Sequence, residues 1–245
     1  MFSFFNKTKK INIGEIVIND MHSHILPGID DGAVDLDTSI ALLNGMIESG
    51  FKTFTGTPHI MAELHKNDRN TIETAHNGLT EKLKHINFHH KIRYAAEYMV
   101  DEQFPELLKN GDMLPIFGNT LLIETPYYHE PLEMQEILFE IETAGYKAIL
   151  AHPERYHYMD NQLKVLQKYI DRGFDLQVNI LSLTGYYGPK EKEMAERLLE
   201  AGIVQYLGSD IHHERHMKRI LNFETNKNIA KILENTQWKN HDLKD

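Results

Sequence analysis

Seven short apolar stretches alternate with helical patterns, and this alternation limits most strongly what the chain can fold into. The strand candidates lie near residues 16–22, 52–57, 92–97, 120–125, 147–152, 174–179 and 203–208. Helical spacing of apolar residues marks 36–49, 132–144 and 190–201, and a glycine follows each of these patterns. A strand, a helix and a glycine in repeated order are typical of βα units. The sequence therefore predicts an α/β fold whose parallel strands form a closed or nearly closed barrel.

Histidine and carboxylate side chains stand at the ends of these apolar stretches. They are His22, His24, His59, Glu97, Glu124, His152, Asp210 and His212. Because the C-termini of parallel barrel strands meet on one face, we expect these side chains to converge there. Imidazole nitrogens and carboxylate oxygens bind Zn, Mn or Fe. About eight ligands are too many for one ion, so the pattern predicts a site for two or three.

Glu97 and Glu124 end strongly apolar strands, where an unpaired carboxylate is costly to bury. A bound cation is the partner that we expect beside them, and an ordinary salt bridge is the alternative. Asn179 ends the sixth strand candidate, where it either contacts a group that supports the site or forms a turn. Most of the histidines that end no strand are expected on the surface.

Composition excludes several classes of function. The net charge of −10 argues against nucleic acid as a partner, because phosphate backbones are held by clustered Lys and Arg and no such cluster is evident. The absence of cysteine excludes disulfides, thiolate ligands and a cysteine nucleophile. With 245 residues, 41% of them hydrophobic, the chain can bury one core, so we expect a single domain over 1–245 with its core at about 16–224.

Neither end of the chain predicts a targeting or membrane segment. In MFSFFNKTKKINIGE the apolar part is too short for a signal peptide and precedes the basic residues. No stretch approaches the roughly 20 apolar residues of a membrane-spanning helix, so we expect a cytoplasmic protein without direct membrane insertion. The polar, lysine-rich tail after about residue 225 is expected to form a peripheral helix and a frayed end.

Six motifs in order carry a resemblance to a known family. They are HSHILPGIDDGA at 22–33, TPH at 57–59, AEY at 96–98, IET at 123–125, AHPERY at 151–156 and GSDIH at 208–212. From about residue 17 to about residue 215 the chain resembles the polymerase and histidinol phosphatase (PHP) superfamily, and within it the manganese-dependent tyrosine phosphatases of bacterial capsular and exopolysaccharide biosynthesis. The resemblance implies the PHP fold, a distorted (β/α)7 TIM-like barrel. It also implies two or three divalent metal ions, most often Mn with Fe, Zn or Mg as alternatives.

The resemblance implies a ligand set for each of three ions. His22, His24, Glu97 and Asp210 would surround the first ion. Glu97 would bridge to a second ion held by Glu124 and His152. Asp31, His59 and His212 would hold the third, with Asp30 as an alternative to Asp31 in the same turn.

The resemblance also implies phosphate-binding arginines, Arg155 and Arg215, of which Arg215 has a different spacing from its motif. An arginine offers phosphate a bidentate donor fork, although Arg155 could instead pair with Glu154. Aromatic faces in the loops after the strands could flank a phenyl ring, and loop packing is the alternative. These residues are Tyr127, Tyr128, Tyr156, Tyr158, Tyr186 and Tyr187.

The function that we expect is hydrolysis of phosphotyrosyl protein by a metal-activated hydroxide, which replaces the missing cysteine nucleophile. The resemblance implies that the substrate is a membrane tyrosine autokinase of capsule assembly. A phosphatase of histidinol phosphate or another small molecule is the alternative enzyme. A phosphodiesterase fits the acidic charge less well, and a non-catalytic metal-binding module would not need so complete a ligand set.

Overall fold

The structure, a computed structural model, describes residues 8–158 and 162–243. Its parallel strands are β2 (Asn19–Ser23), β3 (Thr53–Gly56), β4 (His59–Ile60), β5 (Lys91–Tyr94), β6 (Glu97–Met99), β7 (Thr120–Glu124), β8 (Lys147–Ala151), β9 (Asp175–Asn179) and β10 (Tyr206–Gly208). They form a six-stranded sheet in the order β10-β9-β8-β7-β6-β4 and a three-stranded sheet in the order β2-β3-β5. An antiparallel pair joins β1 (Thr8–Lys10) to β11 (Glu224–Asn226).

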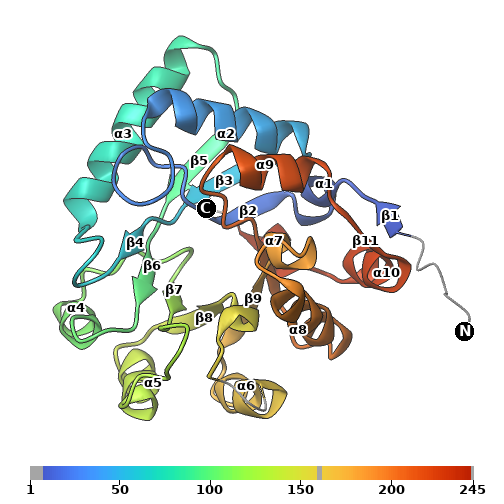
Figure 1. Cartoon of the computed structure of the whole chain (residues 1–245). Coiled ribbons are helices and arrows are strands. Elements are labelled where there is room, and N and C mark those ends of the chain that lie inside the picture. The colour runs from blue at the N-terminus through green and yellow to red at the C-terminus, as the bar shows by residue number, and fades with distance from the viewer. Residues whose placement is uncertain (1–7, 159–161, 244–245) are drawn as a thin grey trace, which may run out of the picture.

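Helices lie outside the strands, which surround the centre of the molecule (Figure 1). The helices are α1 (Ile13–Val17), α2 (Leu36–Glu48), α3 (Arg69–His85), α4 (Phe104–Asn110), α5 (Met134–Thr143), α6 (Gln162–Ile170), α7 (Ile180–Leu183), α8 (Pro189–Glu200), α9 (Glu214–Leu221) and α10 (Lys227–Asn235), with 3-10 turns η1 (Pro153–Arg155) and η2 (Lys239–Asp242). Among the described residues, no helix is long and apolar enough to cross a membrane.

Each predicted strand overlaps an observed one, but the third prediction, 92–97, was wrong as a single strand. It divides at Ala95 and Ala96 into β5 and β6, which belong to different sheets. The segment 53–60 is interrupted in the same way, because Pro58 lies between β3 and β4. Proline has no N–H, so it cannot continue a ladder of hydrogen bonds. The carbonyl of Pro58 still accepts a hydrogen bond from the N–H of Glu97 at 3.1 Å, where the second sheet begins.

The predicted helices at 36–49, 132–144 and 190–201 are confirmed as α2, α5 and α8. The start of α5 is the exception, since the helix begins at Met134 and the side chain of Leu132 is exposed. Leu132 therefore does not belong to the buried face on which the prediction placed it. Residues 16–17, predicted as strand, lie in α1.

The alternation of side chains along the strands explains why polar residues reach the centre. In β7, Leu121 and Ile123 join the large apolar cluster that includes helix residues, whereas Leu122 joins a smaller cluster of strand, loop and tail residues. Side chains two apart on a strand share a face, so Glu124 lies on the inner face with Leu122. The same rule places Gln177 and Asn179 inward on β9, since Leu176 and Val178 join the large cluster.

The helix predicted after about residue 225 is confirmed as α10, whereas the chain after it is packed and not frayed as far as residue 243, and residues 244–245 lie outside the described residues. Asn240 is buried between β2 and β10. Its side chain accepts a hydrogen bond from the N–H of Leu207 at 3.0 Å and donates to the carbonyls of Leu207 and Asn19 at 2.8 and 3.0 Å. Asn19 in turn donates from its side chain to the carbonyl of Asn240 at 2.7 Å. A polar side chain thus links two strands of different sheets, which a polar sequence alone does not reveal.

Candidate metal centre

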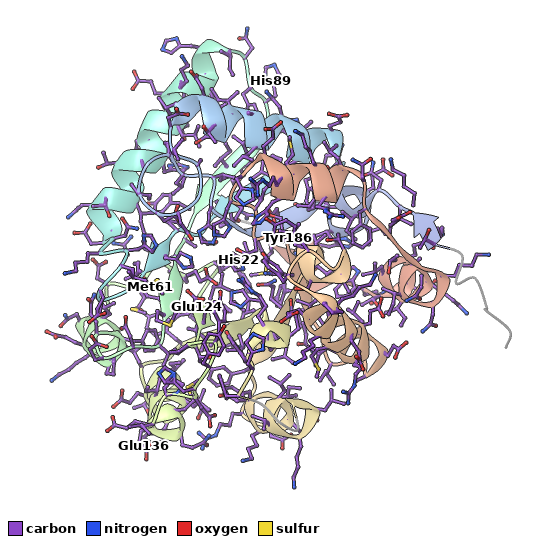
Figure 2. All side chains as sticks on the ribbon, viewed as in Figure 1. His22, Met61, His89, Glu124, Glu136 and Tyr186 are labelled. Atoms are coloured by element: carbon purple, nitrogen blue, oxygen red, sulfur yellow. The ribbon has the colours of Figure 1, made fainter. Side chains whose placement is uncertain are left out.

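The predicted ligands come together at the ends of the strands, as expected. Figure 2 labels two of them, His22 and Glu124, in the middle of the molecule. Beside them lies a pocket of about 300 Å³. Its wall is formed by Asp31, His59, Tyr127, His152, Arg155, Tyr187, Asp210, His212, His213 and His216.

The first group consists of four buried ligand atoms, which are Nε2 of His22, Nε2 of His24, Oε2 of Glu97 and Oδ1 of Asp210. The two histidine atoms lie 3.4 Å apart. Each of them lies 3.2 to 3.5 Å from the two carboxylate oxygens. Four ligands at about 2.1 Å around a tetrahedral ion are separated by about 3.4 Å. His22, His24 and Asp210 therefore have the spacing that one metal ion requires, and Glu97 lies close to both histidines.

A second group forms around Glu97 and Glu124. Nδ1 of His59 lies 3.1 Å from Oε2 of Glu97 and 2.9 Å from Oε1 of Glu124. These three atoms are buried and have no hydrogen-bond partner among the described residues. Nε2 of His152 lies 2.9 Å from the other oxygen of Glu97. Buried polar atoms without partners are costly, so a cation fits this donor set, and Glu97 is shared with the first group.

The third group of ligands lies in the wall of the pocket and consists of Asp31, His59 and His212. Oδ1 of Asp31 lies 3.4 Å from Nε2 of His212 and 3.6 Å from Nε2 of His59. Asp30, the alternative, points elsewhere: its carboxylate contacts Nδ1 of His24 at 2.7 Å. This is the position from which a carboxylate orients a metal-binding histidine.

Gly32 brings the turn with both aspartates close to His24. A Cβ at residue 32 would lie 2.1 Å from the carbonyl oxygen of His24, so only glycine permits this approach. The N–H of Gly32 also donates to Oδ1 of Asp30 at 2.9 Å.

In the first group, oppositely charged side chains stabilise each other's charged forms, which burial disfavours. Burial disfavours the charged form of His22, yet Glu97 and Asp210 raise its pKa above the ordinary value. Burial likewise opposes charge on Asp210, but His22 and His212 hold its pKa well below the usual range. A metal ion must displace the histidine protons, so its affinity is expected to rise with pH.

Two of the predicted ligands have an unusual backbone conformation. His152 has φ of 31° and directly follows β8, and Asp210 has φ of 49° and lies two residues after the end of β10. Residues other than glycine seldom adopt positive φ, and such strain is concentrated at functional sites. The N–H of Asp210 is held by the carbonyl of His22 at 2.8 Å, so a second ligand supports this turn.

Gln177, which sequence reasoning missed, completes a chain of hydrogen bonds behind the first group. Its Nε2 donates to Oδ1 of Asn179 at 2.8 Å, so its Oε1 is free to accept from Nδ1 of His22 at 2.8 Å. The hydrogen on Nδ1 leaves the lone pair of Nε2 for a metal. Asn179 donates in turn to Oδ2 of Asp210 at 2.5 Å. A polar pair two residues apart in an apolar strand was the available signal.

Arg155 lies in the pocket between two aromatic rings. The centre of its guanidinium is 4.6 Å from the ring of Tyr127 and 4.2 Å from that of Tyr187. It donates to Oδ2 of Asp210 at 3.0 Å. The alternative pairing with Glu154 is wrong, because that carboxylate accepts from the N–H of Asn179 and the hydroxyl of Ser182.

The other predicted substrate contacts divide into two kinds. Tyr127 and Tyr187 line the pocket, whereas the structure does not bring Arg215, Tyr128 or Tyr156 to its wall. Arg215 is exposed on α9. Tyr128 is 79% exposed and stacks on His157. Tyr156 is buried, and its hydroxyl donates to the carbonyl of Ala151 at 2.8 Å.

His216 was expected on the surface, and that expectation was wrong. Its side chain is buried in the pocket wall, on the first turn of α9 and four residues after His212. Burial and the neighbouring His213 lower the pKa of His216 to about 3. The ring is therefore neutral near pH 7.

Comparison with known proteins supports the chemistry of this centre. A family model described as capsular polysaccharide synthesis, CpsB/CapC, matches residues 18–240. The tyrosine-protein phosphatase YwqE of Bacillus subtilis (strain 168) is 30% identical over 200 residues, which cover 79% of this chain and 77% of YwqE. The tyrosine-protein phosphatase CpsB of Streptococcus pneumoniae is 28% identical over 201 residues, which cover 79% of this chain and 82% of CpsB.

A solved structure is also similar. It comes from crystal structures of YwqE from Bacillus subtilis and CpsB from Streptococcus pneumoniae, which are described as unique metal-dependent tyrosine phosphatases. It matches with a TM-score of 0.77 at 26% identity and covers 89% of this chain and 87% of the other. The likeness therefore extends from the motifs to the arrangement of the strands and helices.

Proposed function

The chain belongs to the CpsB/CapC family of capsular polysaccharide synthesis proteins, and on that basis we propose that it is a metal-dependent protein tyrosine phosphatase. The observation that carries this function is the meeting of ligand groups and Arg155 in one pocket. A phosphomonoester needs both an activated water and compensation for the charge of the phosphoryl group. The pocket has donors suited to each requirement.

The ligand assignment that we propose follows the three groups. The first ion would be held by His22, His24, Glu97 and Asp210, the second by Glu97, Glu124 and His152, and the third by Asp31, His59 and His212. His59 has one nitrogen facing each of the last two groups, which supports a compact arrangement. We propose that the site binds two or three divalent ions and that manganese is the preferred metal. Mixed imidazole and carboxylate donors suit a borderline divalent ion.

The roles of the other pocket residues follow from their contacts. Bound divalent ions supply an activated water and offset the charge on the phosphoryl oxygens. Arg155 presents a donor fork to those oxygens, and Tyr127 and Tyr187 hold the two faces of its guanidinium. A leaving phenolate, with a pKa of about 10, needs little help from a general acid, so none is assigned.

For the fold, we propose a distorted (β/α)7 barrel that makes up one domain over 1–245. The isolated bridge between Ser23 and Ile211 supports closure, since it joins the end of β2 to the chain that follows β10. Asn240 supports it at the other end of the same two strands. A closed arrangement would keep all ligand-bearing strand ends on one face.

For the partner, we propose a phosphotyrosyl protein in the cytoplasm, and more narrowly a membrane tyrosine autokinase. The relatives named as tyrosine-protein phosphatases and the capsular polysaccharide family support this choice. The net charge of −10 counts against nucleic acid as a substrate.

The test is a hydrolysis panel with and without added manganese. The substrates are a phosphotyrosyl peptide, a phosphoseryl peptide, histidinol phosphate and a DNA oligomer. We expect the phosphotyrosyl peptide to have the highest specificity constant and chelation to abolish its hydrolysis. A tenfold preference for histidinol phosphate would overturn the substrate, and full activity after complete chelation would overturn the metal dependence.

A further inference from the structure

His216 lies on the inner side of α9, in the wall of the pocket, although the preceding Arg215 was the expected phosphate ligand. The side chain of His216 is 5% exposed, whereas Arg215 is exposed and outside the pocket wall. Successive helical residues project about 100° apart. A helix that turns residue 216 inward therefore turns residue 215 away.

The backbone of His212 fixes where the ring of His216 carries its hydrogen. The N–H of His212 donates to Nδ1 of His216 at 3.2 Å. A nitrogen that accepts a hydrogen bond has no hydrogen of its own, so this contact leaves the ring hydrogen on Nε2. Tyr186 meets the ring edge-on at 4.6 Å and His213 packs 3.9 Å from its centre, so the orientation of the ring is also restrained.

Nε2 of His216 is the unused donor of this arrangement. Within 8–158 and 162–243 no side chain accepts a hydrogen bond from it within 3.5 Å, although the backbone carbonyl of Asp210 lies near the ring, and it is not among the fully buried polar atoms that lack a partner. Since the ring lines the pocket, this N–H is open to the pocket. Arg155 and His216 both lie against Tyr187, at 4.2 and 6.2 Å from its ring centre, so two donors border one cavity.

We propose that His216 donates a hydrogen bond from Nε2 to a phosphoryl oxygen of the substrate, and so takes the place expected of a second arginine. The inference rests on the proposed function and assigns a further substrate-binding residue to that site. A hydrogen bond to a charged oxygen is stronger than one between neutral groups, and it strengthens as charge develops on the phosphoryl group.

Two substitutions separate the nitrogens of the ring. His216→Asn places an amide oxygen near Nδ1, where it can accept from His212, but it has no group at the position of Nε2. In His216→Gln, the amide NH2 group reaches the position of Nε2 and can donate a hydrogen bond, but no acceptor remains at the position of Nδ1. Arg219→Gln, an exposed change on the same helix, is the matched control. All variants are prepared as the full chain loaded with manganese and compared for metal content, kcat/KM on a phosphotyrosyl peptide, and inhibition by inorganic phosphate.

We expect His216→Asn to lose about 10- to 100-fold in kcat/KM and in phosphate affinity, with unchanged metal content. His216→Gln should lose less, and Arg219→Gln should match the wild type. Values for His216→Asn within threefold of the wild type would overturn the proposal. A loss of metal in that variant would also overturn it, because the residue would then act through His212.

A measurement on the unmodified chain keeps the proposal testable if His216→Asn does not fold. In zinc-loaded protein with ¹⁵N-labelled histidine, the ring of His216 should carry its hydrogen on Nε2, and the Nε2 signal should shift when inorganic phosphate is added. A hydrogen on Nδ1, or no shift at saturating phosphate, would overturn the proposal. Should the wild type bind phosphate through His216 but hydrolyse no phosphotyrosine, the proposed function fails and the donor assignment stands.

Discussion

Arg155 donates a hydrogen bond of 3.0 Å from Nη1 to Oδ2 of Asp210. The other oxygen of Asp210, Oδ1, faces His22 and His24 at 3.5 and 3.4 Å. One carboxylate therefore connects the proposed phosphate ligand to the first metal group. Asp210 keeps its metal-facing oxygen free because Asn179, Tyr187 and Arg155 all contact Oδ2.

Arg155→Ala is expected to keep its metal ions but to lose about 10²–10³-fold in kcat/KM, because one donor to the phosphoryl group disappears. Arg155→Lys should restore little, since an ammonium has no planar fork and stacks less well between the two tyrosines. The measurements are metal content and steady-state kinetics on a phosphotyrosyl peptide. Arg215→Ala should have a much smaller effect than Arg155→Ala. An unchanged specificity constant in Arg155→Ala would return that arginine to a structural role.

Glu97→Ala and His152→Ala are expected to abolish turnover of p-nitrophenyl phosphate in a protein that remains folded. Glu97 belongs to two groups, so its loss should lower the number of ions per chain more than loss of His152. Elemental analysis and circular dichroism are the measurements, and Glu106→Ala, on the surface, is the control. Full metal content together with the wild-type rate in either variant would refute the assignment.

Sequence patterns correctly predicted the features of the fold that depend on residues close together in the chain. The inward direction of Glu124 follows from the two-residue period of an apolar strand, and the end of α2 follows from a glycine. The break between β5 and β6 was not predicted, because the strands there pair with a segment that is itself interrupted at Pro58, between β3 and β4. The ligand residues could be found for a related reason: each stands at a strand end, where topology brings distant segments together.

The residues that support the ligands escaped prediction because their partners are distant in sequence. Gln177 contacts His22 across 155 residues, and Asn240 contacts Asn19 across 221. The spacing of residues within either segment does not indicate these contacts. Arg215 and His216 differ by one position, and only the rotation of α9 decides which of them meets the pocket.

Asp20→Asn is expected to stabilise the metal-free protein at pH 8 but not at pH 4. Burial raises the pKa of Asp20 from 3.8 to about 6, against hydrogen bonds from Ser209. The folded state therefore holds the proton more tightly than the unfolded state, so the stability contribution of Asp20 falls as pH rises from 3.8 to about 6. The loss amounts to about 3 kcal/mol, which the neutral asparagine avoids.

Urea unfolding of both proteins after chelation, at pH 4 and pH 8, measures this effect. The asparagine can still accept from the N–H of Ser209 and donate to its hydroxyl, so the local contacts are retained. Equal pH dependence in the two proteins would contradict the buried, protonatable state of Asp20.

Asn240→Ala is expected to destabilise the protein by about 2–4 kcal/mol, because it leaves the N–H of Leu207 and the carbonyl of Asn19 without their partner in the interior. Asn235→Ala, an exposed change whose side chain contacts only the carbonyl of Lys231, should stay within about 0.5 kcal/mol of the wild type. The free energy of unfolding in urea decides the comparison. Equal stability of the two variants would show that the end of the chain does not hold β2 and β10 together.

Asp31→Asn and Asp30→Asn are expected to have different effects on metal binding. The difference shows which of the two aspartates is the metal ligand. Asp31 faces His59 and His212, so its substitution removes a ligand charge and should lower the number of bound ions. Asp30 contacts the nitrogen of His24 that faces away from the first group, so its substitution should keep the number of ions at saturating metal. Its affinity for metal or its activity should instead fall about 10- to 100-fold, as is typical when a partner that orients a ligand is lost. Metal titration followed by elemental analysis distinguishes the two, and the reverse pattern would make Asp30 the ligand.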